Sequence, residues 1–145
     1  MKVFLDTNVF LDYFQHREQY KAVSYLLNAV EDGRIKAVIS IGGIYTLSYL
    51  VRMELKKKGI YRPEQTLRLR EILNGVVELA TVKGISHKMT CRAINDKGFD
   101  DIEDSFQHQC AVESMCDIII TINKKHFTYS EIPVMTPQEF VDSLK

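Results

Sequence analysis

The side chains best suited to chemistry in this sequence are carboxylates gathered at two places. Asp6 directly follows the short apolar run at residues 3–5, and four acids fall within residues 100–104. Two ionised carboxylates 4 Å apart repel each other by about 4 kcal/mol at an effective dielectric constant near 20. A divalent cation removes that repulsion, and oxygen ligands of this kind suit Mg²⁺ or Mn²⁺ rather than zinc. The carboxylates therefore indicate a site for one of these two ions.

The same acids also have purely structural interpretations. An aspartate that follows a strand often forms a turn or caps a helix, and this applies to Asp6. Asp100 and Glu103 fit a capping box at the start of a helix, where the helix dipole also favours acids. A cap accounts for one or two carboxylates but not for four within five residues. The cluster is therefore interpreted as more than a helix cap.

The spacing of apolar residues predicts the elements that must position these carboxylates. Predicted strands are residues 3–5, 37–41, 76–82, 117–121 and 134–135. Predicted helices are residues 8–13, 20–31, 47–58, 63–73, 86–94, a segment opened by Asp100 or Asp101, and 137–144. Because strands alternate with helices, we expect a single domain over residues 1–145, an α/β fold with a mostly parallel sheet of about five strands and helices on both faces.

In such a sheet the ligand site lies just beyond the carboxyl ends of the strands. Asp6 lies at that end of the first strand, and Thr121 and Asn123 lie at that end of the strand at 117–121. Asp117 begins that same strand, and a strand of five residues spans roughly 17 Å. We therefore interpret Asp117 as structural and expect Thr121 and Asn123 at the site.

The four histidines receive two interpretations. His108 lies one helical turn beyond Asp104 and is expected near the rim of the site. His16, His87 and His126 show no spacing typical of metal ligands and are interpreted as ordinary surface or core residues.

Composition excludes several classes of protein. Lys+Arg and Asp+Glu are both 19, so the formal net charge is zero, which excludes a histone-like cation or an acidic tail. No apolar run reaches the roughly 18 residues of a membrane-spanning helix, and the N-terminus lacks a signal-peptide pattern. The three cysteines form no disulfide or zinc pattern. We expect a cytoplasmic protein without a membrane partner.

Five short motifs, taken in order, resemble the PIN domain family, the metal-dependent ribonuclease fold of VapC-like toxins. They are Leu5-Asp6-Thr7-Asn8-Val9, Ile39-Ser40, Asp101-Ile102-Glu103-Asp104, Thr121-Ile122-Asn123 followed by Phe127, and Ile132-Pro133-Val134 followed by Pro137-Gln138-Glu139-Phe140. The resemblance covers essentially the whole chain. It implies a three-layer α/β/α sandwich with a parallel central sheet, a carboxylate site for Mg²⁺ or Mn²⁺, and cleavage of RNA phosphodiesters by metal-activated water.

Carried over residue by residue, the resemblance implies catalytic roles for Asp6, Asp104 and Asn123. The implied metal ligands are Asp6 and Asp104, with Glu103 or Asp101 as a third. The residues that would support them by hydrogen bonds are Thr7, Asn8, Thr46 and Thr121.

Two positions depart from the family's pattern. The second acid of the family, a glutamate six residues after Ser40, is replaced by Thr46. His126 stands before Phe127, where the family usually has an aspartate. With only Asp6 and Asp104 as obligatory carboxylates, we expect weaker metal binding than at a four-acid site, and a two-metal site is disfavoured.

One stretch of the chain is strongly basic. Residues 52–70 hold seven basic residues against two acids, a local excess of +5. A charge run is either a solvated surface or a contact for a polyanion. On a ribonuclease it would neutralise the RNA backbone without reading bases. The residues assigned to this contact are Arg52, Lys56, Lys57, Lys58 and Arg62.

Three functional hypotheses follow. The first is a metal-dependent endoribonuclease, the toxin of a toxin–antitoxin pair, with RNA, an antitoxin and a second copy of the chain as partners. The second is a catalytically weakened PIN fold that binds nucleic acid or protein, and its motivation is Thr46. The third is a phosphatase or haloacid-type hydrolase, which needs an Asp-x-Asp pair that Asn8 interrupts.

Overall fold

Five parallel strands form one central sheet in the order β3-β2-β1-β4-β5 in the computed structural model, which describes residues 1–145. The strands are β1 (Lys2–Leu5), β2 (Lys36–Ser40), β3 (Ala80–Lys83), β4 (Ile118–Ile120) and β5 (Val134–Met135). Strand β1 is central, with Phe4 opposite Val38 on one side and Ile119 on the other. The apolar runs of β1 and β4 are buried on both faces, as a covered parallel sheet requires.

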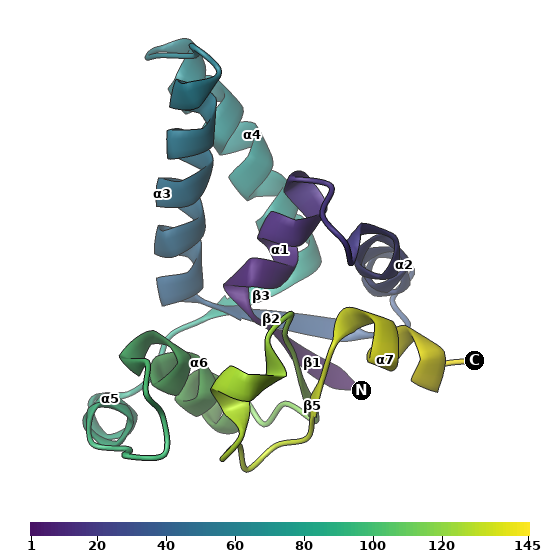
Figure 1. Ribbon diagram of the computed structural model, residues 1–145, viewed down its shortest axis with the longest axis vertical. Coiled ribbons are helices and arrows are strands. Elements are labelled where there is room, and N and C mark those ends of the chain that lie inside the picture. The colour runs from purple at the N-terminus through teal and green to yellow at the C-terminus, as the bar shows by residue number, and fades with distance from the viewer.

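Helices cover both faces of the sheet and complete three layers (Figure 1). One face packs against α1 (Thr7–Phe14), α2 (Tyr20–Glu31), α3 (Ile41–Lys57), α4 (Glu64–Leu79) and α7 (Pro137–Ser143). The other packs against α6 (Ile102–Glu113) and the short 3₁₀ helix η1 (Lys124–Phe127), with α5 (His87–Ile94) packed against α6. Alternate residues of β1 point to opposite layers, so Val3 and Leu5 join the first core and Phe4 joins the second.

The predicted three-layer α/β/α architecture and its parallel, five-stranded sheet are confirmed, whereas several element boundaries differ; α3, for example, begins at Ile41 rather than at residue 47. The apolar run at 76–82 was expected to be one strand, but Val76 is buried as part of α4 and β3 begins only at Ala80. A short apolar run does not by itself distinguish a strand from a buried helical segment. Helix α1 begins at Thr7, one residue before its predicted start, and Asp6 occupies the N-cap position without a side-chain capping hydrogen bond.

The start of α6 also differs from one expectation. Asp101 is the N-cap, and its Oδ1 accepts a hydrogen bond from the backbone N–H of Glu103 at 2.9 Å. The capping box expected between Asp100 and Glu103 is not formed. One acid of the cluster is therefore used as a cap, which leaves Glu103 and Asp104 in the first turn of the helix.

Helices α3 and α4 form a hairpin that extends away from the sheet, at the top of Figure 1. The 17 residues of α3 make it about 25 Å long. Its first turn lies at the carboxyl end of β2, and its last turn carries Lys56 and Lys57 at the far tip. No helix in the protein is both long and apolar enough to span a membrane.

Candidate active site

A cavity of about 280 Å³ lies at the carboxyl end of β1 and β2, where the first turns of α1, α3 and α6 meet. This is the edge of a parallel sheet at which ligand sites are expected. Four acids and one histidine line it, and no lysine or arginine does. The polar side chains that line it are Asp6, Thr7, Asn8, Ser40, Thr46, Asp101, Glu103, Asp104, Gln107 and His126.

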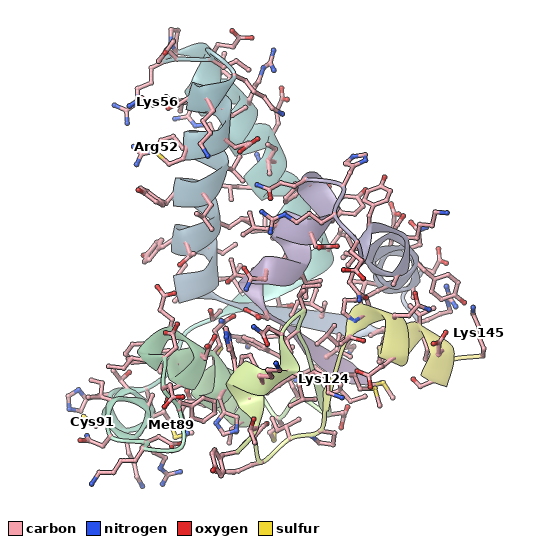
Figure 2. All side chains as sticks on the ribbon, viewed as in Figure 1. Arg52, Lys56, Met89, Cys91, Lys124 and Lys145 are labelled. Atoms are coloured by element: carbon pink, nitrogen blue, oxygen red, sulfur yellow. The ribbon has the colours of Figure 1, made fainter.

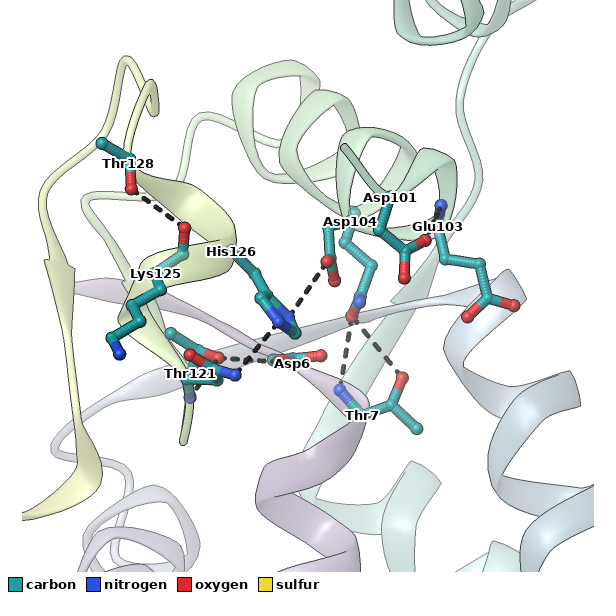
Figure 3. Close-up of polar contacts among 11 residues, drawn as sticks. Asp6, Thr7, Asp101, Glu103, Asp104, Thr121, Lys125, His126 and Thr128 are labelled. Atoms are coloured by element: carbon teal, nitrogen blue, oxygen red, sulfur yellow. Dashed lines mark hydrogen bonds and ion pairs between the residues drawn. The ribbon is translucent and has the colours of Figure 1, made fainter. Parts of the chain in front are cut away.

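Asp6 is held rigidly at the floor of this cavity. It is only 2% exposed, and the buried hydroxyl of Thr121 donates a hydrogen bond to its Oδ2 at 2.7 Å (Figure 3). Burial raises the pKa of Asp6, and the polar groups around the carboxyl act in the opposite direction: the Thr121 hydroxyl first, then the Gln107 side chain and the backbone of Asn8 and Thr7. The carboxylate is therefore oriented and desolvated at once.

Asp104 provides the second carboxylate, from the first turn of α6. It is 8% exposed, and its pKa is raised to about 6. Burial is the largest cause, and the negative charge of Asp6 is the next. The two carboxylates therefore disfavour each other's ionisation, as paired acids do in the absence of a cation.

His126, which we interpreted as an ordinary histidine, instead contacts Asp104. Its Nδ1 lies 3.2 Å from Asp104 Oδ2, and its Nε2 lies 3.0 Å from the side-chain amide nitrogen of Asn123. Figure 3 shows the contact between the His126 imidazole and Asp104. Asn123 itself does not line the cavity and reaches Asp104 only through His126.

The remaining candidate ligands line the cavity without completing a ligand set. Glu103 and Asp101 both face it, and Asp101 is engaged in capping α6. No three His, Cys, Asp or Glu side chains lie close enough together to hold a metal ion in this arrangement. Thr46 lines the cavity from α3, so the position of the family's missing glutamate does face the site.

One of the expected supporting residues, Thr7, links the first turn of α1 to α6. The backbone N–H of Thr7 donates to Gln107 Oε1 at 3.3 Å, and its hydroxyl lies 3.5 Å from the same oxygen. Sequence reasoning missed Gln107, although it lies three residues after Asp104 and therefore on the same side of α6. Its amide links α6 to the first turn of α1, beside Asp6.

Gly43 allows α3 to approach this first turn of α1. A Cβ atom at this position would lie 2.9 Å from Thr7 Oγ1 and 3.2 Å from Ser40 Oγ. Ser40 is the N-cap of α3, and its hydroxyl accepts a hydrogen bond from the Gly43 N–H at 2.8 Å. The close packing of α1 against α3 at the cavity therefore requires a residue without a side chain.

Of two further predictions from the sequence, the one for Asp117 is confirmed and the one for His108 is wrong. Asp117 accepts a hydrogen bond from the backbone N–H of Lys2 at 2.8 Å, at the far end of the sheet, so its structural role is confirmed. His108 was wrongly expected at the rim of the site. It is 1% exposed, its ring centroid is 5.0 Å from that of Phe99, and its Nε2 accepts a hydrogen bond from the N–H of Glu131. It does not line the cavity, because its ring packs inward against Phe99 although it lies one helical turn from Asp104.

The basic residues expected to bind RNA do not line the carboxylate cavity. Arg52 and Lys56 project from the outer side of α3 toward the tip of the hairpin (Figure 2). Arg52, Lys56 and Arg62 line a separate cavity of about 460 Å³ with Tyr61, whereas Lys57 and Lys58 face the groove between α1 and α3. The basic stretch is therefore divided between two surfaces of the hairpin.

A family model described as a PIN domain matches residues 2–125, which is most of the chain. This chain belongs to the PIN domain family. Ribonuclease VapC1 of Aquifex aeolicus (strain VF5) is 27% identical to it over 143 residues, which cover 97% of this chain and 94% of that protein.

Solved structures show the same fold. VapBC2 from Rickettsia felis, bound to a DNA fragment from its promoter, matches this PIN domain with a TM-score of 0.66 at 16% identity, covering 94% of this chain and 98% of that chain. A toxin–antitoxin complex from Klebsiella pneumoniae matches with a TM-score of 0.62 at 23% identity, covering 93% and 97% of the two chains.

The residues of this PIN domain fit a divalent cation. Asp6 and Asp104 are buried together with raised pKa values, and His126 is the only side chain lining the cavity that can carry a positive charge. A doubly charged ion bound to both carboxylates would offset their burial and their mutual repulsion. Carboxylate oxygens with room for water suit Mg²⁺ or Mn²⁺.

Proposed function

We propose that this PIN domain is an endoribonuclease that hydrolyses RNA phosphodiester bonds with Mg²⁺ or Mn²⁺, as the toxin of a toxin–antitoxin pair. The observation that carries the proposal is the pair Asp6 and Asp104, buried with raised pKa values in a cavity without lysine or arginine. The relation to ribonuclease VapC1 and the fold shared with VapBC2 support the same activity.

The residues of the site take distinct roles in this proposal. Asp6 and Asp104 would hold the ion, with Glu103, which also lines the cavity, as a further candidate ligand. Thr121 and Gln107 fix the orientation of Asp6. The other supporting residues fix the positions of α1 and α3 at the cavity. A divalent ion supplies Lewis-acid chemistry: it acidifies water and neutralises charge on the phosphate during hydrolysis.

Asn123 and His126 act together in this proposal. The Asn123 amide faces Nε2 of the imidazole, which makes Nδ1 the donor toward Asp104. This hydrogen bond orients the carboxylate toward the cavity. Asn123, expected as a catalytic residue, therefore acts as a positioning residue through His126.

The antitoxin is the proposed protein partner. A groove of about 980 Å³ runs between α1, α3 and α4 and is lined by apolar and polar residues in equal number. Asn8 lines both this groove and the carboxylate cavity. A segment of a partner chain seated in the groove would therefore lie at the mouth of the cavity and restrict access of RNA.

The test is calorimetric titration of Mn²⁺ and Mg²⁺ into the wild type and Asp104→Asn, with RNA cleavage measured on the same samples. The proposal requires saturable binding and metal-dependent cleavage that are both lost in the variant. Metal-dependent cleavage that persists at the wild-type rate in Asp104→Asn would not come from this carboxylate site and would refute the assignment. A chain that binds RNA but neither metal would favour the second candidate, a weakened PIN fold, which Thr46 motivates.

A further inference from the structure

The solvent face of α3 carries a row of aromatic and basic side chains that the fold does not use. Tyr45 is 69% exposed and Tyr49 is 54% exposed. Arg52 and Lys56 follow at intervals of three and four residues, so all four side chains lie on one face of the helix. The Arg52 guanidinium carbon lies 5.8 Å from the centre of the Tyr49 ring.

The packing of the helix does not require these residues. The opposite face of α3 is formed by Leu47, Val51 and Leu55, which are buried against the core. A single exposed tyrosine is ordinary on a protein surface. A continuous row of exposed aromatics and cations on one helix face is instead typical of a binding surface.

The row joins two cavities. At its lower end, Tyr45 is adjacent in the chain to Thr46, which lines the carboxylate cavity. At its upper end, Arg52 and Lys56 line the cavity of about 460 Å³ at the hairpin tip, together with the exposed Tyr61. The twelve residues from Tyr45 to Lys56 span about 16 Å along the helix. This length accommodates several nucleotides in a row.

We propose that this face of α3 binds single-stranded RNA and leads it to the carboxylate cavity. Tyr45 and Tyr49 stack on bases, while Arg52 and Lys56 contact phosphates. The proposal rests on the proposed ribonuclease function and adds to it the surface along which the substrate is bound.

The chemistry of the row favours single strands over other partners. Aromatic side chains stack on bases only where those bases are free of a duplex, and cations beside them neutralise the backbone. The centre of a protein–protein interface is depleted in charged residues, whereas Arg52 and Lys56 occupy half of this row. The local excess of +5 over residues 52–70 also complements a polyanion.

The test measures fluorescence anisotropy of a labelled oligouridylate with the full chain in metal-free buffer, where no cleavage interferes. Tyr49→Ala is expected to raise the Kd about tenfold, and the double variant Tyr45→Ala/Tyr49→Ala is expected to raise it further. Tyr49→Phe keeps the ring and should bind like the wild type. The same RNA annealed to its complement should bind more weakly than the single strand.

Tyr25→Ala is the matched control, because the Tyr25 ring, on α2, lies 5.8 Å from the guanidinium carbon of Arg34 in the turn that follows this helix. Its Kd should not change. Unchanged binding in the double variant, or equal binding of single strand and duplex, would overturn the inference. So would sedimentation velocity that shows a wild-type dimer and a monomeric double variant, since the row would then be a contact between copies.

These experiments distinguish a failure of the proposed RNA surface on α3 from a failure of the proposed nuclease function. Asp104→Asn should bind the single strand as the wild type does, although it is expected to be inactive. Loss of binding in the tyrosine variants together with an inactive wild type would support the RNA surface and refute the nuclease. Metal-dependent cleavage that is unaffected by Tyr45→Ala/Tyr49→Ala would retain the nuclease and refute this path for its substrate.

Discussion

Nδ1 of His126 lies 3.2 Å from Oδ2 of Asp104, which joins the 3₁₀ helix η1 to the first turn of α6 across the carboxylate cavity. The imidazole is 45% exposed and the Asp104 side chain is 11% exposed, so the contact lies at the opening of the cavity. Asn123 holds the far side of the ring. The orientation of the second carboxylate therefore depends on two residues from the segment that follows β4.

His126→Ala is expected to weaken Mn²⁺ binding by about tenfold to a hundredfold, which is the usual effect of losing a partner that orients a ligand. Asn123→Ala should act in the same direction but less strongly, and the double variant should be no worse than His126→Ala alone, because the amide acts through the ring. Calorimetry measures all three. His87→Ala is the control, since His87 is exposed on α5 and contacts only Cys91 among side chains. Equal affinity in His126→Ala and the wild type would contradict the role.

Asp104→Asn should stabilise the metal-free protein while it removes metal binding. The buried charge of Asp104 beside Asp6 is unfavourable at neutral pH without a cation, and the amide carries no charge. We expect the free energy of unfolding at pH 7 to rise by about 1–3 kcal/mol in urea denaturation. At saturating Mn²⁺ the wild type should instead be more stable than Asp104→Asn, because only the wild type gains stability from the bound ion. The exposed Asp100 does not line the cavity, and Asp100→Asn should change neither quantity.

The stability of the metal-free protein should depend on pH through Asp104. Its pKa is raised from 3.8 to about 6 on folding, so between these values the folded state binds more protons than the unfolded state. The free energy of unfolding should therefore fall as pH rises from about 4 to about 6 and level off above. The raised pKa of Asp6 acts in the same direction. Urea denaturation across this range checks the slope, and the wild type should lose more stability than Asp104→Asn. If the free energy of unfolding depended on pH equally in both proteins, Asp104 would not be the source of the pH dependence.

Thr46→Glu should strengthen metal binding, because it places a carboxylate in the cavity at the position where the family has its second acid. We expect at least about a tenfold gain in Mg²⁺ affinity, since the new charge attracts the ion at short range. RNA cleavage should increase with it. Thr46→Gln has the same shape without the charge and should not bind the ion more tightly. If both variants gave the same affinity, the cavity would not be the metal site.

Gly43→Ala should disturb the site from a distance. Its Cβ would lie 2.9 Å from Thr7 Oγ1, and the resulting shift of α1 would reach Asp6 through the next peptide bond. We expect a loss of about 1–3 kcal/mol of stability, as in other overpacked positions, together with weaker Mn²⁺ binding. Gly42→Ala is the matched control, because its nearest neighbour would be Ser40 Oγ at 3.9 Å. It should be neutral or slightly stabilising, since alanine favours the helix.

Local patterns in the sequence were sufficient to predict most of the helices and strands and to single out the two carboxylates Asp6 and Asp104. The apolar runs around Phe4 and Ile119 were correctly predicted as buried strands, and the alternation with helices favoured parallel pairing. Once the sheet was parallel, Asp6 and Thr121 had to lie at one edge and Asp117 at the other. These conclusions depend on periodicity and strand direction, which are properties of neighbouring residues.

The tertiary structure alone decided which side chains meet. His126 and Gln107 belong to the site, and His108 does not, because the rotation of α6 and η1 about their own axes is set by core packing. The hydrogen bond from Thr121 to Asp6 joins residues 115 positions apart in the chain. The row on α3 has a readable spacing, but only the packing of Leu47, Val51 and Leu55 shows that it faces solvent. Contacts of this kind depend on how the helices dock on the sheet, and the periodicity of one segment carries no information about that docking.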